Sequence, residues 1–449
     1  MADTPASPIQ LTRDLDKDSA LVSELFADLD GELAGLPARP ERTEPQQAAA
    51  SAILDRGRAA REDYLAVHVA ALYDTLTGGR TRTLRVAELA YAAADLVPGL
   101  VPTRERIAEE RTHPQKDKEG WEQDQGILIS HVLDDPVAGH HLMHAMAQPL
   151  PEALELLDEL RRTDRVDLGT SLVERHGNVG HLTIQHHKYL NAEDDESTRA
   201  MEIATDLILL DDRIDIGVLR GAESRHPKYL GRRVFDAGVN LTRLYHGEVS
   251  LIEFFIEREL GLITKWFRGH SLGDGRVSVV ERRHEKPWIA AVDTFAIGGG
   301  CQFLLVMDRV VARSGAYVNL PARREGFLPG CGNMRLPRFV GEKVARQGIF
   351  FNRDIYVDSP EGRQIVDDLV VDEEGMQAAI ANAVDALTAT GHVGVNANRT
   401  QIRVAAEPLE TFRHYMANLA IGQARCMYSP AIIRNLEAAW DPKRRGGVK

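Results

Sequence analysis

Three consecutive glycines, Gly298, Gly299 and Gly300, are the residues of this 449-residue chain whose type and spacing most clearly suggest chemistry. They follow an apolar run, Trp288–Val292, that predicts a buried strand, and they precede an apolar segment, residues 303–307, that predicts the start of a helix. Without Cβ atoms the backbone can approach a bound group closely, and free N–H groups at a helix start suit a negative charge. Because the spacing matches neither the dinucleotide fingerprint nor a P-loop, the glycines favour an oxyanion hole over a phosphate site.

Arg258 places a cation on the apolar face of a helix predicted over residues 251–266. The residues that share this face at helical spacing are Leu251, Phe254, Phe255 and Leu262. A buried charge is costly unless it is paired. Two interpretations follow: Arg258 anchors a substrate oxygen or pairs a catalytic carboxylate, or it is a structural or surface arginine.

The elements that must position these residues change in type near residue 165. Before this point, apolar residues recur at helical spacing between breaker segments, which predicts an all-α N-terminal domain. After it, residues 178–185 and 214–219 predict strands, and residues 197–210 predict a helix between them. Alternating strands and helices indicate an α/β domain. Residues 400–435 predict C-terminal helices that prolines interrupt.

The bulk composition is that of a globular protein with two domains or one large domain: 43% of the residues are hydrophobic and 27% are charged. The 54 basic and 67 acidic residues give a formal charge of −13, which argues against nucleic acid or an anionic membrane as a main partner. The first residues contain no apolar secretion signal, and no apolar run is long enough to span a bilayer. We therefore expect a cytoplasmic protein.

Histidines are numerous, but their pattern does not predict a metal site. The three cysteines lie far apart without a CxxC pair, so neither a disulfide framework nor a thiolate site is indicated. The histidines cluster twice, at His140, His141 and His144 and at His181, His186 and His187. No carboxylate completes a ligand set at a telling spacing, and the clusters lie in different predicted domains. We expect no metal ligand among them.

Four segments in order resemble the crotonase (enoyl-CoA hydratase/isomerase) superfamily over residues 175–435. GHLTIQHHKYLNA (180–192) resembles its opening strand and CoA-adenine loop, and RRVFDAGVNL (232–241) its first oxyanion loop, F-x-A-G-x-x-L. IAAVDTFAIGGGCQ (289–302) resembles the second oxyanion loop, and LPARREGFLPGCGNMRLPRFVG (320–341) the segment that follows it. One motif would be weak evidence, whereas four in the right order imply the fold.

The resemblance implies that the protein binds acyl-CoA thioesters and holds the thioester oxygen by two backbone N–H groups. By position these donors are Val239, directly after Ala237 and Gly238, and Gly299. Preorganised donors of this kind contribute about 3–4 kcal/mol each to an oxyanion transition state. A glycine-rich turn kept only for tight packing would explain the triplet but not the other three segments.

Two departures from the family pattern argue against a hydratase. Where hydratases carry two glutamates, this chain has Gln302, directly after the Gly-Gly-Gly-Cys, and Ala322, directly after Pro321. Water addition needs a titrating acid and base at these positions, and neither an amide nor a methyl group titrates. Ala322 instead leaves a small apolar space beside the α-carbon, which would suit an apolar reactant such as dioxygen.

A helical N-terminal extension joined to a core that lacks both glutamates is similar to one subgroup, the 3,5-dihydroxyphenylacetyl-CoA 1,2-dioxygenases of glycopeptide-antibiotic pathways. Residues 118–146 also fit that subgroup. The resemblance implies that an arylacetyl-CoA enolate reacts with O2 without metal, flavin or other cofactor, giving 3,5-dihydroxyphenylglyoxylate and CoA. Two other interpretations are another acyl-CoA isomerase, decarboxylase or thioesterase, and a non-catalytic acyl-CoA-binding or scaffold protein.

Two carboxylates are candidates within this framework. Glu193 follows the segment that lines the family's acyl and CoA sites, so it could accept a hydrogen bond from a substrate hydroxyl. As one of four acids at 193–196, it could equally support the start of a helix. Glu325 is the only carboxylate in the fourth segment and is a fallback base.

Three basic or titrating side chains are further substrate-binding candidates. His226 lies in a connection that is longer than in most members of the family and could line the substrate pocket. Lys188 and Arg233 lie in the first two family segments, where a cation could bind CoA phosphates. For each of them, a solvated loop charge is the alternative.

The expected architecture has three parts: a helical N-terminal domain (1–170), a crotonase-like α/β core built as a ββα spiral (171–390) and a C-terminal helical region (391–449). The family assembles as trimers or dimers of trimers, so we expect a homo-trimer or homo-hexamer with the C-terminal helices at a subunit interface. The predicted catalytic residues are Val239, Gly299, Arg258 and Gln302, and the predicted substrate-binding residues are Glu193, His226, Ala322, Lys188 and Arg233.

Overall fold

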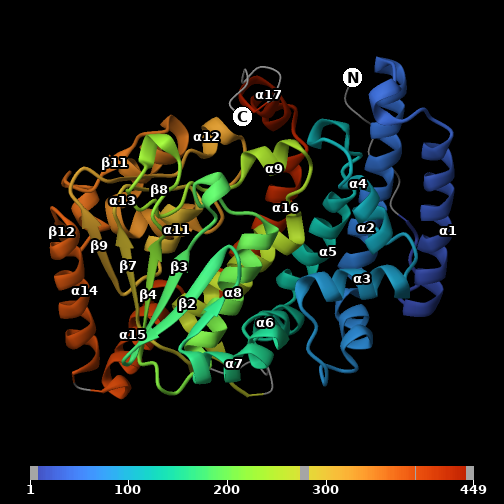
Figure 1. The fold of residues 1–449 in the computed structure, drawn as a ribbon. Helices are drawn as coiled ribbons and strands as arrows, with labels where there is room; N and C mark the ends of the chain where they lie inside the picture. Colours follow the sequence, from blue (N-terminus) through green and yellow to red (C-terminus); the bar gives the residue numbers. More distant parts are fainter. Residues whose placement is uncertain (1–8, 274–282, 390, 441–449) are drawn as a thin grey trace.

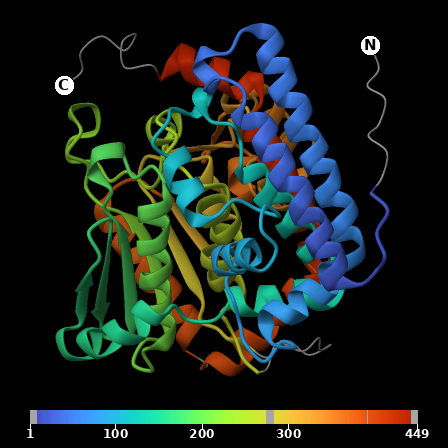
Figure 2. The same cartoon turned by 90° about the vertical axis from the view of Figure 1, so that its right-hand side faces the viewer.

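The N-terminal part of the chain is helical, as its apolar periodicity predicted. A computed structural model describes residues 9–273, 283–389 and 391–440. Within these ranges seven α-helices precede the first strand (Figure 1). They are α1 (Leu15–Ala34), α2 (Glu44–Thr77), α3 (Val86–Leu96), α4 (Arg104–Glu110), α5 (Glu122–Asp134), α6 (Pro136–Met146) and α7 (Pro151–Thr163). In Figure 2, α1 and α2 lie side by side at the outer surface.

The rest of the chain is built on a seven-stranded sheet in which the first three strands pair antiparallel and the others pair parallel. Its strands in spatial order are β1 (Arg165–Asp167), β2 (Ser171–His176), β3 (Val179–Ile184), β4 (Ile216–Gly221), β7 (Trp288–Val292), β9 (Arg309–Arg313) and β12 (Asp368–Val370). A second sheet contains β11 (Ile355–Tyr356), β10 (Tyr317–Asn319) and β8 (Phe295–Ile297), and β5 (His270–Ser271) pairs with β6 (Arg283–His284). The α/β character predicted beyond residue 165 is confirmed.

Helices cover both faces of the large sheet, because its central strands are apolar on both sides. On β7, Ile289 and Ala291 point toward α14 (Glu373–Thr388), whereas Trp288, Ala290 and Val292 belong to the core on the opposite face. The helix α8 (Asp195–Leu210) and the apolar side of α7 pack into the core on this opposite face. The helix α7, on the N-terminal side of the predicted boundary near residue 170, packs against α8 on the other side of it. The boundary therefore stays a prediction.

The C-terminal helices begin and end at the predicted prolines: α15 (His392–Ala406) stops before Pro408, α16 (Leu409–Met427) follows it, and α17 (Pro430–Ala439) begins with Pro430. That the C-terminal helices lie at a subunit interface stays a prediction, because α16 shows its contacts within one chain. Its apolar side packs against α5 of the same chain, in one core that joins the helical domain to the α/β part (Figure 1).

The helix predicted over residues 251–266 exists, but most of it has π-helical hydrogen bonding. It consists of η5 (Leu251–Ile256), η6 (Arg258–Ile263) and a short α10 (Thr264–Arg268). A π-helical segment is rare and occurs often at functional sites. The sequence pattern therefore identified the apolar face correctly, but it did not reveal that the hydrogen bonding is π-helical.

The glycine triplet is not a turn ahead of the helix, as we expected, but forms the beginning of it. A further short strand, β8, precedes Gly298, and α11 (Gly299–Leu304) begins with the second glycine. Gly298 adopts a positive φ of 55°, which glycine accepts without strain. The remaining helices are α9 (Leu241–Tyr245), α12 (Ala322–Glu325) and α13 (Gly332–Phe351).

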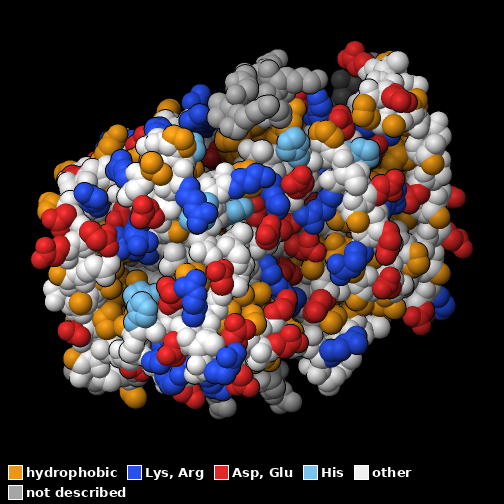
Figure 3. All heavy atoms as spheres, viewed as in Figure 1, with side chains coloured by type: hydrophobic (Ala, Val, Ile, Leu, Met, Phe, Trp, Pro, Cys, Tyr) orange, Lys and Arg blue, Asp and Glu red, His pale blue; other side chains and the backbone are white. Residues whose placement is uncertain are grey.

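The surface carries both charge signs. On the face shown in Figure 3, acidic and basic side chains lie interspersed, with hydrophobic side chains scattered among them. In the described part of the chain, no helix combines the length and the apolar character that crossing a bilayer requires.

Arg111, at the end of α4, connects the helical domain to two elements of the α/β part. It pairs with Asp195 at the start of α8 and, at 3.1 Å, with Glu253 in η5. Burial raises the pKa of Asp195 to about 6, against the opposing effect of Arg111. The arginine therefore holds in place the two elements that follow Glu193 and precede Arg258.

We expect Arg111→Gln to lower the unfolding midpoint more at about pH 8 than at about pH 5. The pKa of Asp195 in the folded protein lies above its ordinary value of 3.8, so the protein loses stability as the pH rises between the two values. Without Arg111 the pKa of Asp195 in the folded protein rises further, so the loss of stability continues to a higher pH. Thermal unfolding at both pH values tests this. Arg165→Gln, which breaks the more exposed pair with Glu174, should change neither midpoint by much, and an equal shift at both pH values would contradict the prediction.

Candidate active site

Six of the nine predicted site residues line a cavity of about 430 Å³, called the inner pocket here. A larger hollow of about 1760 Å³, the outer groove, lies beside it and shares Val239, Pro321 and Glu325 with it. The inner pocket is lined by Glu193, Val239, Phe254, Phe255, Arg258, Glu259, Gly298, Gly299, Gln302, Pro321, Ala322, Glu325, Phe327, Leu328, Pro329 and Gly330.

The two glycine loops meet at the wall of the inner pocket. A Cβ on Gly238 would lie 3.1 Å from the carbonyl oxygen of Ile297, and one on Gly298 would lie 3.3 Å from the Cα of Gly238. Within the described residues, no hydrogen bond occupies the N–H group of Val239 or of Gly299. Two unoccupied donors on neighbouring loops are the geometry that an oxyanion hole requires.

Asp236 joins the two loops from behind. Its carboxyl accepts a hydrogen bond from the N–H of Gly238 at 2.6 Å and another from the N–H of Gly300. Burial, and then the charge of Glu193, raise the pKa of Asp236 well above its ordinary value. One buried carboxyl thus positions both loops. Asp236 was not singled out from the sequence, although it lies in the segment RRVFDAGVNL.

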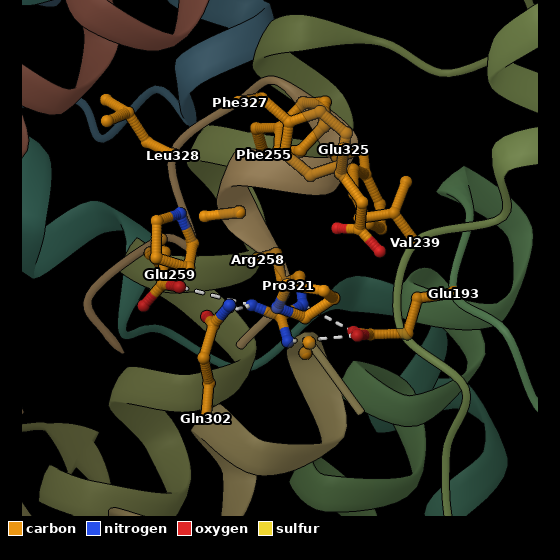
Figure 4. Close-up of a pocket in the computed structure, with 16 residues that line it drawn as sticks. Glu193, Val239, Phe255, Arg258, Glu259, Gln302, Pro321, Glu325, Phe327 and Leu328 are labelled. Atoms are coloured by element: carbon orange, nitrogen blue, oxygen red, sulfur yellow. Dashed lines mark hydrogen bonds and ion pairs between the residues drawn. The ribbon is translucent and has the colours of Figure 1, made fainter. Parts of the chain in front are cut away.

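Arg258 is the centre of a buried polar network in this pocket, which Figure 4 shows. Its guanidinium donates to both carboxylate oxygens of Glu193, with Nη2 at 3.1 Å from Oε1. Nη1 donates to Glu259 Oε1 at 3.1 Å and to Gln302 Oε1 at 3.0 Å. Arg258 is 4% exposed and Glu193 1%, so a surface arginine is excluded and the structure pairs Arg258 with carboxylates.

Burial has opposite effects on the two partners. It raises the pKa of Glu193, and Arg258 acts against it. Burial lowers the pKa of Arg258, but Glu193 and Glu259 outweigh it and the pKa is raised overall. Asp194, and not Glu193, caps the following helix, so the helix-start interpretation of Glu193 is wrong. The charged network faces the cavity and holds one cation between two anions.

Gly299 leaves no room for a side chain beside this network. A Cβ there would lie 1.5 Å from Glu193 Oε1 and 2.5 Å from Arg258 Nη2. The N–H group of Gly299 and the Glu193–Arg258 pair therefore occupy adjacent positions. Glycine is needed here for close approach, as the sequence predicted, but the group that approaches is a protein carboxylate.

The positions where hydratases carry glutamates both line the inner pocket. Gln302, in α11, bonds Arg258, and Ala322, at the start of α12, contributes a methyl group. The opposite wall contains Phe255 and Phe327, whose ring centroids lie 5.6 Å apart in an edge-on arrangement. The pocket thus combines aromatic and aliphatic walls with the Arg258 network.

Glu325 and Glu259 are two further carboxylates of the inner pocket, and they differ in their partners. Glu259 was missed in the sequence; its carboxylate also accepts from the N–H of Cys331 at 3.2 Å and lies 3.6 Å from Arg335. Within the described residues Glu325 has no ion pair and no side-chain hydrogen bond. Burial raises the pKa of Glu325 to about 8.

The remaining candidates lie outside the inner pocket. Lys188 and His226 line the outer groove together with Arg324. Arg233 lines neither hollow among the residues described; its guanidinium donates to the carbonyl oxygen of Gly221 at 3.3 Å, so the structure does not bring it to the site.

The histidine clusters are used in separate contacts. His140 contacts Glu410, His141 bonds the hydroxyl of Tyr73, and His144 lies 2.9 Å from the hydroxyl of Ser271. In the described ranges of the chain, no group of three or more His, Cys, Asp or Glu side chains is arranged to hold a metal ion.

Known proteins resemble this chain in sequence and in fold. Residues 280–416 match the family described as Enoyl-CoA hydratase/isomerase. A (3,5-dihydroxyphenyl)acetyl-CoA 1,2-dioxygenase of Amycolatopsis orientalis is 48% identical over 402 residues, which cover 89% of this chain and 91% of the relative. A short-chain-enoyl-CoA hydratase of Clostridium acetobutylicum is 31% identical over 223 residues, 49% of this chain and 76% of the hydratase.

The crystal structure of an enoyl-CoA hydratase/isomerase from Xanthobacter autotrophicus Py2 superposes with a TM-score of 0.50 and 21% identity, and it covers 62% of this chain and 94% of that one. That likeness concerns the fold of the α/β part. The likeness to the Amycolatopsis protein extends over most of the chain and so includes helical N-terminal residues as well. The chain therefore belongs to the crotonase (enoyl-CoA hydratase/isomerase) superfamily, as its four sequence segments predicted.

Proposed function

We propose that this protein is a dioxygenase that converts 3,5-dihydroxyphenylacetyl-CoA and O2 into 3,5-dihydroxyphenylglyoxylate and CoA. The observation that carries the proposal is the 48% identity to the Amycolatopsis dioxygenase over 89% of the chain. The reaction balances without water or a further reactant: both α-hydrogens leave the carbon, one on the product acid and one on the thiol of CoA, and the product gains both oxygen atoms of O2.

The two hollows divide the substrate between them. The aryl group enters the inner pocket, whose walls include Phe254, Phe255 and Phe327. The CoA portion lies in the outer groove, where Lys188 and Arg324 offer cations for phosphate groups. The thioester then lies where the hollows share Val239, and its oxygen takes the hydrogen bonds of the Val239 and Gly299 N–H groups.

The buried network positions the aromatic ring and its hydroxyl groups. Glu193 accepts a hydrogen bond from one ring hydroxyl, and the side-chain amide of Gln302 forms a hydrogen bond with the second ring hydroxyl. Arg258 holds the side chains of Glu193 and Gln302 in position. At the outer end of the substrate, His226 contributes to the groove wall. The contacts of Arg258 with Glu193 and Gln302 at the cavity wall support these roles.

Enolate formation followed by reaction with O2 explains the two departures from the hydratase pattern. Gln302 and Ala322 supply no titrating pair for water addition. The enolate is benzylic and electron-rich, so it transfers an electron to O2 directly and needs no metal or flavin. The methyl of Ala322 and the nearby aromatic rings leave apolar space for O2 beside the enolate.

Oxygen uptake with 3,5-dihydroxyphenylacetyl-CoA tests this function. The expected result is stoichiometric consumption of O2 and release of CoA after exhaustive chelation, by protein whose absorbance shows no flavin. No uptake, or uptake that a chelator abolishes, would refute the proposal. Formation of an isomerised, decarboxylated or hydrolysed product under nitrogen would point to another crotonase-type reaction instead.

We also propose that the protein forms a homo-trimer or homo-hexamer, the assembly that the family resemblance implies. Exposed hydrophobic side chains on the α/β part, Phe350 and Phe351 at the end of α13, offer apolar surface for such contacts. Light scattering coupled to size-exclusion chromatography measures the assembly directly, and a monomer at micromolar concentration would refute it.

A further inference from the structure

Glu325 lies at the junction of the inner pocket and the outer groove. The inner pocket and the outer groove share three residues, Val239, Pro321 and Glu325. A thioester that places its aryl group in the pocket and its CoA in the groove puts the carbonyl and the α-carbon at this junction. Val239 supplies the hydrogen bond to the carbonyl oxygen there, and Glu325 is the one junction residue with a titrating side chain.

Among the three carboxylates of the inner pocket, Glu325 is the one for which the described residues form no ion pair. Glu193 is paired with Arg258, and Glu259 with Arg258 and the N–H of Cys331. In the described residues Glu325 has neither an ion pair nor a side-chain hydrogen bond. In Figure 4 its carboxylate points into the cavity, on the side of Val239 and above the Glu193–Arg258 pair.

The surroundings of Glu325 favour a base that works near neutral pH. Phe255 and Phe327 line the same cavity, and burial raises the pKa of Glu325 to about 8, with nearby Arg324 opposing the rise. A carboxylate that is destabilised in this way binds a proton more tightly than an ordinary glutamate. A general base is most effective when its pKa lies near the operating pH.

We propose that Glu325 is the general base that removes the α-proton of the bound thioester, an inference that rests on the proposed function. One oxygen of its carboxylate forms an O–H bond while the α-C–H bond breaks. The electron pair of that bond moves into the enolate, whose oxygen the N–H groups of Val239 and Gly299 hold. The step needs no oxidant, and O2 reacts only with the enolate that the step produces.

Exchange of the α-hydrogens under nitrogen separates this step from the reaction with O2. In D2O the wild-type protein should incorporate deuterium at the α-carbon of 3,5-dihydroxyphenylacetyl-CoA, as measured by mass spectrometry. Glu325→Gln should slow both this exchange and O2 uptake by about 100-fold or more, since a positioned base contributes 10²–10⁴. Glu325→Asp should restore part of both rates, because it keeps a carboxylate.

The exchange and the O2 uptake test the role of Glu325 and the dioxygenase function separately. Exchange or O2 uptake by Glu325→Gln at the wild-type rate would overturn the role of Glu325. Exchange that depends on Glu325 without any O2 uptake by the wild type would refute the dioxygenase and leave the base in place. Glu342→Gln, the same substitution at an exposed position on α13, should change neither rate.

The pH dependence of stability shows whether Glu325→Gln folds and whether Glu325 has the proposed environment. A raised pKa in the folded protein means that the wild type loses stability as the pH rises from about 5 to about 8. The glutamine variant cannot ionise there, so its unfolding midpoint relative to wild type should increase over this range. An unchanged difference would show that the pKa of Glu325 is not raised, and it would argue against Glu325 as the base.

Discussion

Gly299→Ala is expected to lower kcat by about 100-fold or more, the effect of losing one oxyanion donor. The added Cβ would lie 1.5 Å from Glu193 Oε1, so either the helix start moves and carries the Gly299 N–H away, or the Glu193–Arg258 pair moves. Both changes disturb the enolate site. Steady-state O2 uptake with 3,5-dihydroxyphenylacetyl-CoA measures the effect.

Gly31→Ala is the matched control for this variant. Gly31 lies within α1, where an added Cβ meets no atom within 4 Å, so turnover should be unchanged and stability slightly higher, by about 0.5–1 kcal/mol. Binding of CoA in the outer groove, followed by calorimetry, should persist in Gly299→Ala. Wild-type turnover by Gly299→Ala would show that this N–H does not stabilise the oxyanion.

Arg258→Met is expected to lower the free energy of unfolding by about 3 kcal/mol and to abolish measurable turnover. Removing one partner of a buried ion pair leaves the other charge unpaired, which typically costs 3–5 kcal/mol. Here Glu193 loses its only ion-pair partner within the described residues, whereas Glu259 keeps Arg335 at 3.6 Å. Urea unfolding and O2 uptake measure the two effects.

The double variant Arg258→Met, Glu193→Gln separates stability from activity. It should regain part of the lost unfolding free energy, because the unpaired carboxylate is gone, while turnover stays absent. Arg258→Lys should lower turnover and keep CoA binding, since one ammonium group cannot replace the forked contacts to Glu193 and Gln302. Arg346→Met, at an exposed pair, is the control. An unchanged rate in Arg258→Lys would remove Arg258 from the site.

The sequence alone was sufficient for the features that depend on local backbone geometry. A backbone turn that must come close to another group requires glycine, and so Gly238 and Gly298–Gly300 identified the two loops that meet at the inner pocket. The same locality explains why the prolines located the ends of α15 and the starts of the helices after it. Gln302 and Ala322 were informative because each follows a residue pattern of the family directly, Gly-Gly-Gly-Cys for Gln302 and Pro321 for Ala322.

The three-dimensional arrangement decided which side chains act together. Glu193 and Arg258 are 65 residues apart and Arg258 and Gln302 are 44 apart, and no periodicity links them. The sequence left open whether Glu193 is a helix-start charge or a substrate ligand and whether Arg258 is a structural or surface arginine or a functional one, and it offered Glu325 only as a fallback base. A choice between such alternatives depends on burial and on the nearest opposite charge, which are properties of tertiary packing. The packing pairs Glu193 with Arg258, leaves Glu325 unpaired at the junction of pocket and groove, and excludes Arg233 from both hollows.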